Sequence, residues 1–222
     1  DLLDVMRGMP IPGVTAILAA QSSGAEFNSS SGTGVYPMAS GFGTTGYHSD
    51  VPYVYVAIRR PMKVPEAGTE VFGVDTRGRL NTDVPGFDTT FPIVDLAIVN
   101  ALSGGSFATS TRLTGTSVVY TNTTATAGTS SNAKFDYMNG WYNFAGTDAD
   151  QISWMFQRAP EFMDIVAYTG DGVVGATQAH NLGVVPEFQI VKCRSNSDPW
   201  PVYNPTIGAS NTLWINETDG ST

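Results

Sequence analysis

The sequence predicts an all-β protein built from tandem antiparallel β-sandwich modules of about 95 residues, the size of a small sandwich domain. Three observations predict it. Charged residues make up only 14% of the chain, against about 25% in a typical globular protein, and Ser, Thr, Asn and 24 Gly take their place. No window carries a sustained helical period. Finally, blocks of sequence recur along the chain, as the following alignments show.

The first recurring block is a strand-like run that ends at a proline. Residues 53–61 align with residues 152–160, which places Pro61 on Pro160. A short apolar run follows in each copy. Because proline cannot donate to a β-ladder, it ends a strand or marks an edge. We therefore interpret the recurrent prolines as strand boundaries.

The second recurring block keeps one constant offset over a long stretch. Residues 91–99 align with residues 185–193, with Pro92 on Pro186. At the same offset the later pairs are Leu113 and Ile207, Val119 and Leu213, Tyr120 and Trp214, Asn122 and Asn216, and Thr124 and Thr218. A single offset held over such a length indicates duplication.

These alignments divide the chain into three copies. We expect the C-terminal part of a preceding repeat at 1–48, a complete β-sandwich repeat at 49–147 and an incomplete following repeat at 148–222. The period is too long for a solenoid repeat. Since the chain begins and ends within the pattern, we expect it to be a fragment of a longer protein.

Short alternating runs separated by turn residues predict the strands. They lie at 54–58, 70–74, 93–99 and 118–122 in the complete copy, and at 153–156, 163–168, 188–193 and 213–216 in the next. Glycine-containing turns are expected at 103–105, 138–140, 169–172 and 219–220. Each copy is thus expected to form a compact antiparallel sandwich.

The charge balance disfavours two classes of partner. Eleven basic residues against twenty acidic ones give a net charge of −9. A nucleic-acid partner requires clustered Lys and Arg, and the densest basic run is only Arg59, Arg60 and Lys63. An acidic surface is repelled by anionic membranes, and no apolar stretch reaches the roughly 18 residues of a membrane span. We therefore expect no nucleic-acid and no membrane partner.

Histidine and cysteine offer no catalytic or metal site. His48 and His180 are far apart in sequence, whereas a metal site requires clustered ligands. His180 precedes Asn-Leu-Gly, which favours hydrogen bonding within a turn. Cys193 is the single cysteine, so no intrachain disulfide forms, and we expect it to be a packed thiol.

The carboxylates are the main alternative for chemistry. Asp148 and Asp150 lie two apart, and Asp171 sits in a Gly-flanked turn. A glycosidase needs two carboxyl groups about 5–9.5 Å apart, but turn and strand-edge roles explain these residues more simply. Calcium at these turns is a second alternative, although the spacing lacks the EF-hand pattern. We predict no enzymatic activity, no catalytic residue and no cofactor.

The aromatic residues carry the best binding hypothesis, because sugar rings stack on them. The candidates for glycan binding are Trp141, Tyr142, Trp200 and Tyr203. Trp141 and Tyr142 adjoin the turn at Asn139 and Gly140 and are expected to be exposed. Trp154 and Trp214, in contrast, are expected to alternate inward as core residues.

An ordered series of short motifs runs through the second half of the chain. The motifs lie at 158–160, 162–172, 180–186, 190–192, 200–203 and 213–216, with further counterparts at 4–8 and 22–26. Together they resemble a repeated β-rich module of tail-fibre-like virion structural proteins of bacteriophages, especially marine phages. The resemblance supplies no catalytic residues.

The resemblance implies a virion structural protein at the extracellular face of a tail fibre or similar appendage. It implies other virion subunits as partners, a homo-oligomer that is a trimer if the protein forms a fibre, and host-surface polysaccharide as a ligand. The alternatives are a capsid decoration or assembly-only protein, and a bacterial surface adhesin. A depolymerase would need paired carboxylates in a cleft.

Overall fold

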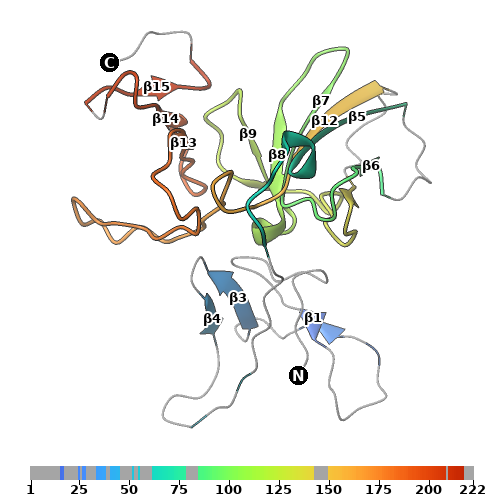
Figure 1. Ribbon diagram of the computed structural model, residues 1–222, viewed down its shortest axis with the longest axis horizontal. Coiled ribbons are helices and arrows are strands. Elements are labelled where there is room, and N and C mark those ends of the chain that lie inside the picture. The colour runs from blue at the N-terminus through green and yellow to red at the C-terminus, as the bar shows by residue number, and fades with distance from the viewer. Residues whose placement is uncertain are drawn as a thin grey trace.

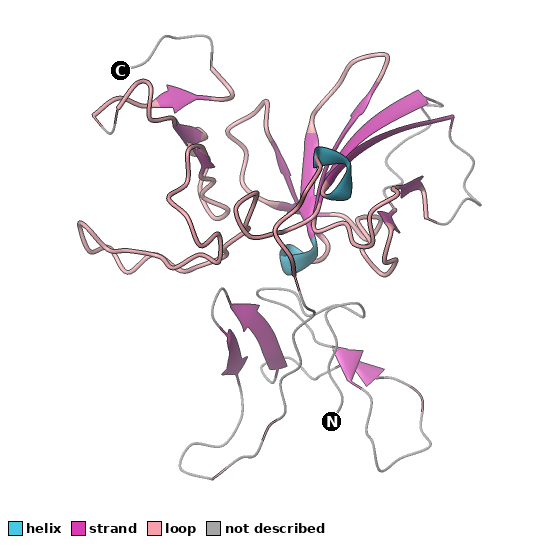
Figure 2. Ribbon diagram, in the orientation of Figure 1, coloured by secondary structure: helices cyan, strands magenta, loops and turns pink. Residues whose placement is uncertain are grey.

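The computed structural model describes residues 16–17, 25, 27–28, 34–38, 41–45, 52, 55, 62–78, 85–142, 150–208 and 210–217. In this part of the chain the prediction of an all-β protein is confirmed. The strands form five antiparallel sheets, and the helices are two three-residue 3-10 turns, η2 (Gly68–Glu70) and η3 (Arg112–Thr114). Figure 2 shows how strand and loop dominate the molecule.

The main sheet has six strands, in the order β10-β9-β8-β7-β12-β5 (Figure 1). They are β5 (Phe72–Gly78), β7 (Leu96–Ala101), β8 (Ala108–Thr111), β9 (Ser117–Tyr120), β10 (Gly128–Thr129) and β12 (Asp150–Phe156). β12 pairs along its length with both β5 and β7. The sheet therefore draws strands from both sides of the predicted boundary at 147/148, and the division into copies stays a prediction.

Four small sheets accompany the main sheet. They are β1 (Ala16–Ile17) with β2 (Phe27–Asn28), β3 (Gly34–Met38) with β4 (Gly41–Thr45), β6 (Phe87–Asp88) with β11 (Gly140–Trp141), and a three-stranded sheet of β13 (Gln189–Ile190), β14 (Pro201–Tyr203) and β15 (Leu213–Trp214). The last of these is the C-terminal sheet, red and orange in Figure 1.

The hydrophobic core lies between the main sheet and the β6–β11 ribbon. Its members are Phe87, Phe91, Val94, Ala97, Val99, Phe135, Trp141 and Met155. β12 alternates strictly, so that Gln151, Ser153 and Met155 are buried on this side. Full burial of a large apolar side chain contributes about 1.5–3 kcal/mol, and this cluster is therefore the main source of stability in the described structure.

Gly140 allows the ribbon to close over the core. A Cβ atom at this position would collide with the carbonyl oxygen of Phe87 and would lie 2.7 Å from the ring of Pro85. Both contacts are closer than real Cβ atoms show. The glycine of the predicted turn at 138–140 is thus required by the approach of β11 to β6.

Most predicted strands in the described residues are found, with shifted ends. β5, β7, β9, β12, β13 and β15 overlap the predicted strands at 70–74, 93–99, 118–122, 153–156, 188–193 and 213–216. The strand predicted at 163–168 is wrong: only an isolated bridge, between Ala159 and Met163, forms there. The strand predicted at 54–58 and the turn predicted at 219–220 fall outside the described residues, apart from residue 55.

Candidate functional site

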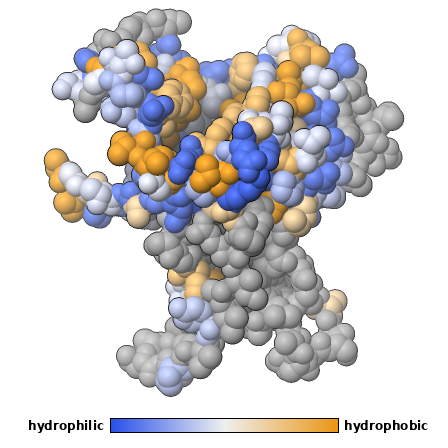
Figure 3. All heavy atoms as spheres, in the orientation of Figure 1, coloured by the Kyte–Doolittle hydropathy of each residue, from blue (hydrophilic) through white to orange (hydrophobic). Residues whose placement is uncertain are grey.

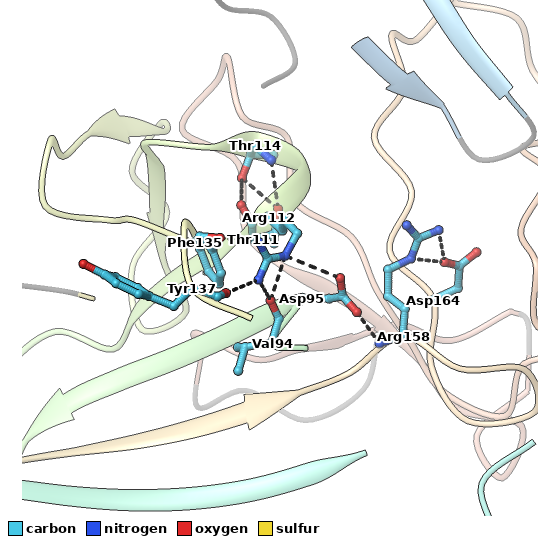
Figure 4. A network of polar contacts seen from close by, with 9 residues as sticks. All are labelled: Val94, Asp95, Thr111, Arg112, Thr114, Phe135, Tyr137, Arg158 and Asp164. Atoms are coloured by element: carbon cyan, nitrogen blue, oxygen red, sulfur yellow. Dashed lines mark hydrogen bonds and ion pairs between the residues drawn. The ribbon is translucent and has the colours of Figure 1, made fainter. Parts of the chain in front are cut away.

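A buried polar network links the core to the segment that follows β12 (Figure 4). Its centre is Arg112 in η3, which is 8% exposed. The guanidinium donates to the carbonyl oxygens of Val94 at 2.8 Å, Tyr137 at 3.0 Å and Phe135. The Arg112 guanidinium thus binds carbonyl oxygens from two loops and holds both loops against the main sheet.

Two carboxylates extend the network. Asp95 Oδ1 lies 3.9 Å from Arg112 Nε, and Asp95 Oδ2 accepts the backbone N–H of Arg158 at 2.8 Å. The Arg158 guanidinium then donates to Asp164 Oδ1 at 2.6 Å. Hydrogen bonds between charged groups are roughly twice as strong as neutral ones, so this series joins the sheet firmly to the chain beyond it.

Asp164 also closes a long loop. It accepts the backbone N–H of Ile165 at 2.9 Å and that of Asn181 at 2.7 Å. The backbone N–H of Glu161 donates to the carbonyl oxygen of Leu182 at 2.8 Å beside it. The loop between these contacts, residues 165–180, extends from the body as an arm (Figure 1).

The network has the character of a structural support. Its carboxylates accept backbone N–H groups, and the Arg112 guanidinium is directed at backbone carbonyls. The Asp164 side chain is only 5% exposed. A general acid or base has to reach a substrate proton within about 2.6–3.2 Å, and the groups here are already engaged with the protein itself.

Trp141, predicted to be exposed, is completely buried, and that prediction is wrong. Its indole Nε1–H donates to Ser153 Oγ at 2.9 Å, and its ring stacks between Phe87 and Phe135. The physical reason is the register of the ribbon, in which Trp141 pairs with Phe87 and faces the main sheet. Trp141 cannot stack on a sugar without unfolding the core.

Trp200 is likewise buried at a contact between two sheets. Its indole N–H donates to the carbonyl oxygens of Tyr120 at 3.1 Å and Thr123 at 3.0 Å. Lys192 Nζ lies 5.8 Å from the ring centre and donates to the Thr124 carbonyl oxygen at 2.8 Å. Trp200 thus anchors the C-terminal sheet to the end of β9.

Tyr142 and Tyr203 keep part of their surface exposed. Tyr142 follows β11, with Lys134 Nζ 5.9 Å from its ring centre, whereas Tyr203 ends β14. The four predicted aromatic residues therefore belong to two different sheets and do not form a single stacking platform.

His180 and Asp171 make the local hydrogen bonds expected of them, although the backbone turn predicted at 169–172 does not form. His180 Nδ1 accepts the N–H of Leu182 at 3.3 Å, and Asp171 Oδ1 accepts that of Val173 at 2.9 Å. Asp150 is exposed at the start of β12. Asp148 and His48 lie outside the described residues.

Cys193 lies three residues past the end of β13, with its Sγ atom 3.6 Å from Ser195 Oγ. It is partly exposed, and its packing is looser than predicted. Across the described residues, no group of three His, Cys, Asp or Glu side chains is placed to hold a metal ion.

One exposed charged cluster precedes β5. Lys63 Nζ lies 3.2 Å from Glu70 and 3.4 Å from Glu66. The hydrogen bond to Glu70 is the main reason that the pKa of Lys63 is raised. The backbone N–H of Glu66, and then Lys63, lower the pKa of Glu70. Lys63 and Glu66 are exposed and Glu70 is partly exposed, so the cluster is a surface feature.

An apolar surface that the sequence analysis missed covers the second face of the main sheet. On β12 the residues opposite the core are Ile152, Trp154 and Phe156, all partly exposed. They lie beside further partly or fully exposed apolar residues on the two neighbouring strands, namely Phe72, Val74, Leu96 and Ile98. We call this set the outer face. The sequence carries a signal for this surface. In β12 the buried positions include polar Gln151 and Ser153, and the alternate positions from 152 to 156, which face away from the core, are all apolar.

Comparison with known proteins identifies one similarity. A family model described as a domain of unknown function (DUF7483) matches residues 143–222. The match begins shortly before β12 and includes the C-terminal sheet. No curated protein and no solved structure matches the chain. In the described part of the chain, no helix has the length and apolarity needed to cross a bilayer.

Proposed function

We propose that this protein is a structural component of a bacteriophage virion, part of a tail fibre or similar appendage. In this role it works by assembly with other virion subunits and stands on the outer side of the particle. Support comes from the ordered motifs of the second half of the chain and from the all-β architecture. The polar network fits the same role, because it reinforces the fold and leaves its charged groups engaged.

The observation that carries the proposal is the outer face. Monomeric soluble proteins rarely expose contiguous apolar patches larger than a few hundred Å². Here Trp154 stacks on Phe107 with ring centres 6.1 Å apart, and Phe72 contacts Phe156 at 4.9 Å. Figure 3 shows apolar atoms at the surface of this part of the molecule. Assembly with other subunits would cover them.

A homo-oligomer is the simplest arrangement that covers the outer face, and in a fibre we expect a trimer. Light scattering of the purified chain tests this. Trp154→Glu should reduce the assembly to a monomer, because it places a charge where apolar surface is buried. Val174→Glu, on the exposed arm, should leave the assembly intact. A monomeric wild-type chain contradicts the proposed oligomer.

Location in the particle is the decisive experiment for the virion role. Cryo-electron microscopy of the intact phage, with gold-labelled antibody to this chain, should place it at the tail or fibre. Label over the capsid lattice would support the decoration protein instead. Label on the bacterial envelope, and none on particles, would support an adhesin.

Recognition of host-surface polysaccharide is the second part of the proposal. Among the aromatic residues predicted for it, only Tyr142 and Tyr203 retain exposed surface. A glycan array should show binding that decreases in Tyr142→Ala or Tyr203→Ala. Binding that is unchanged in both variants would remove these residues from the proposal.

A further inference from the structure

Two parts of the molecule share one topology. β7, β8 and β9 form an antiparallel meander within the main sheet, and β13, β14 and β15 form another in the C-terminal sheet. The pairing is equivalent strand by strand: the row Ile98–Thr109–Val119 corresponds to the row Ile190–Val202–Leu213. The rows coincide in β9 and β15 with the alignment of Val119 on Leu213 that the sequence predicts.

The same side-chain hydrogen bond closes both meanders. Asn122 Oδ1 accepts the backbone N–H of Phe107 at 3.1 Å, and Asn216 Oδ1 accepts that of Trp200 at 2.8 Å. In each case the aromatic residue stands just before the middle strand. Its carbonyl oxygen accepts the N–H of the residue preceding the Asn, at 3.0 and 3.2 Å. The two meanders are therefore built by the same local interactions.

They differ in what covers their first strand. The outer edge of β7 pairs with β12, and Val99, which belongs to the hydrophobic core, is 2% exposed. In the described residues β13 pairs with β14 alone. In the strand pairing Val191 takes the place of Val99, two residues before Cys193, on which the sequence alignment sets Val99. Val191 is 43% exposed, and the nearby Phe188 and Val185 are 57% and 86% exposed.

The outer edge of β13 carries backbone groups that a further strand could bind. Val191 N–H donates to the carbonyl oxygen of Pro201 at 3.1 Å, toward β14. Because N–H and C=O groups alternate sides along an antiparallel strand, those of Ile190 point to the opposite edge. An exposed apolar strand edge of this kind is a template for pairing with another chain.

We propose that the outer edge of β13 binds residues 53–61 of a second copy of this chain, the segment that aligns with β12, because β12 itself is already paired on both edges by β5 and β7. The occupant is indicated by the first meander, where β12 fills the equivalent edge with six paired residues. β12 lies at the start of the segment matched by the family model, yet it pairs with strands that precede that segment. A strand of one unit thus already completes the sheet of its neighbour. The added strand would gain main-chain hydrogen bonds and cover the exposed apolar residues.

This inference deepens the proposed assembly role and rests on it for its biological setting. Its test uses the purified 222-residue chain and synthetic peptides, so it can fail while the virion location holds. The first probe is a labelled peptide of residues 150–158, and the second is one of residues 53–61, which align with 152–160. Fluorescence anisotropy measures binding, with a scrambled peptide as the reference.

We expect saturable binding that Ile190→Lys weakens at least about tenfold, because a lysine on an edge strand opposes pairing. Val174→Lys makes the same change on the exposed arm and should leave the affinity unchanged. Ile190→Pro removes the outward N–H and should abolish binding, with a thermal melt to confirm folding. In sedimentation velocity, Ile190→Lys should also reduce self-association of the chain.

Three results would overturn the proposal. They are no binding of either peptide at a concentration of about 100 times a micromolar Kd, binding unaffected by Ile190→Lys, or an equal loss of affinity in Val174→Lys. Self-association that is lost in Trp154→Glu and kept in Ile190→Lys would place the contact on the outer face. That outcome leaves the proposed oligomer intact and removes the strand-docking edge.

Discussion

The two meanders offer a comparison within one chain. Both are three-stranded and closed by an equivalent Asn, yet Val99 in the first is buried and Val191 in the second is exposed. The first meander has β12 on its outer edge and the β6–β11 ribbon over one face. Local interactions thus set the path of the strands, whereas neighbouring elements decide burial.

The largest difference in stability between the main sheet and the C-terminal sheet should come from replacing the tryptophan that packs against each of them. Trp141→Ala removes the centre of the core and should lower the free energy of unfolding of the main sheet by about 3–5 kcal/mol. Trp200→Ala should instead release the C-terminal sheet locally. Hydrogen exchange resolved by residue measures both effects.

In the Trp200→Ala variant, amide protection should fall within residues 189–217 and remain in β7 and β12. Trp141→Phe serves as the milder control for the core, because it keeps an aromatic ring and loses the bond to Ser153. Loss of protection throughout the main sheet in Trp200→Ala would show that the two regions unfold as one.

A smaller loss of stability is expected when the polar network that joins the main sheet to the segment after β12 is broken. Asp164→Ala leaves the Arg158 guanidinium and the N–H of Asn181 without their acceptor, which should cost about 1–3 kcal/mol. Chemical denaturation measures the loss, and limited proteolysis should cut residues 165–180 faster. Asp171→Ala, in an exposed turn of the same loop, should change stability by less than about 0.5 kcal/mol. Equal effects of the two substitutions would contradict a special role for Asp164.

The smallest and sharpest comparison is between the two equivalent asparagines. Asn122→Ala and Asn216→Ala each remove the acceptor of one backbone N–H, and Asn122→Ala also removes the long hydrogen bond, 3.5 Å, to the Gly105 carbonyl oxygen. Each substitution should lower the free energy of unfolding by about 0.5–1 kcal/mol, the lower part of the range for a net hydrogen-bond contribution. Asn122→Ala should lower the melting temperature of the main sheet, and Asn216→Ala should raise exchange only in the C-terminal sheet. The opposite assignment would contradict the comparison.

The sequence predicts the all-β class and six of the fifteen described strands, because apolar alternation and turn residues are local signals. Among the strands that were missed, β8 and β14 have little alternating hydrophobicity at Ala108–Thr111 and Pro201–Tyr203. The failed prediction at 163–168 has a specific cause. The apolar residues there are typical of a strand, but the Asp164 side chain binds Arg158 and Asn181. Among the described residues, that segment pairs only through the isolated bridge between Ala159 and Met163.

The candidate site was less predictable than the fold. Turn chemistry at His180 and Asp171 is local, and it was found. The burial of Trp141 depends on pairing with Phe87, more than fifty residues away, so the adjacent Asn-Gly turn pointed to the wrong environment. Arg112 gave no signal because its partners are backbone carbonyls of distant residues.

The closed base of the loop at residues 165–180 has a practical consequence. Since Asp164 and Asn181 hold its two ends together, the cost of closing the loop grows only with the logarithm of its length. Doubling the loop adds roughly 0.6 kcal/mol. The arm could therefore carry a foreign peptide inserted near Gly172, or be cut there by a protease, while both ends stay fastened to the same carboxylate. Variation in this loop is thus separated from the stability of the sheets, which makes the arm a natural place for a surface to diversify.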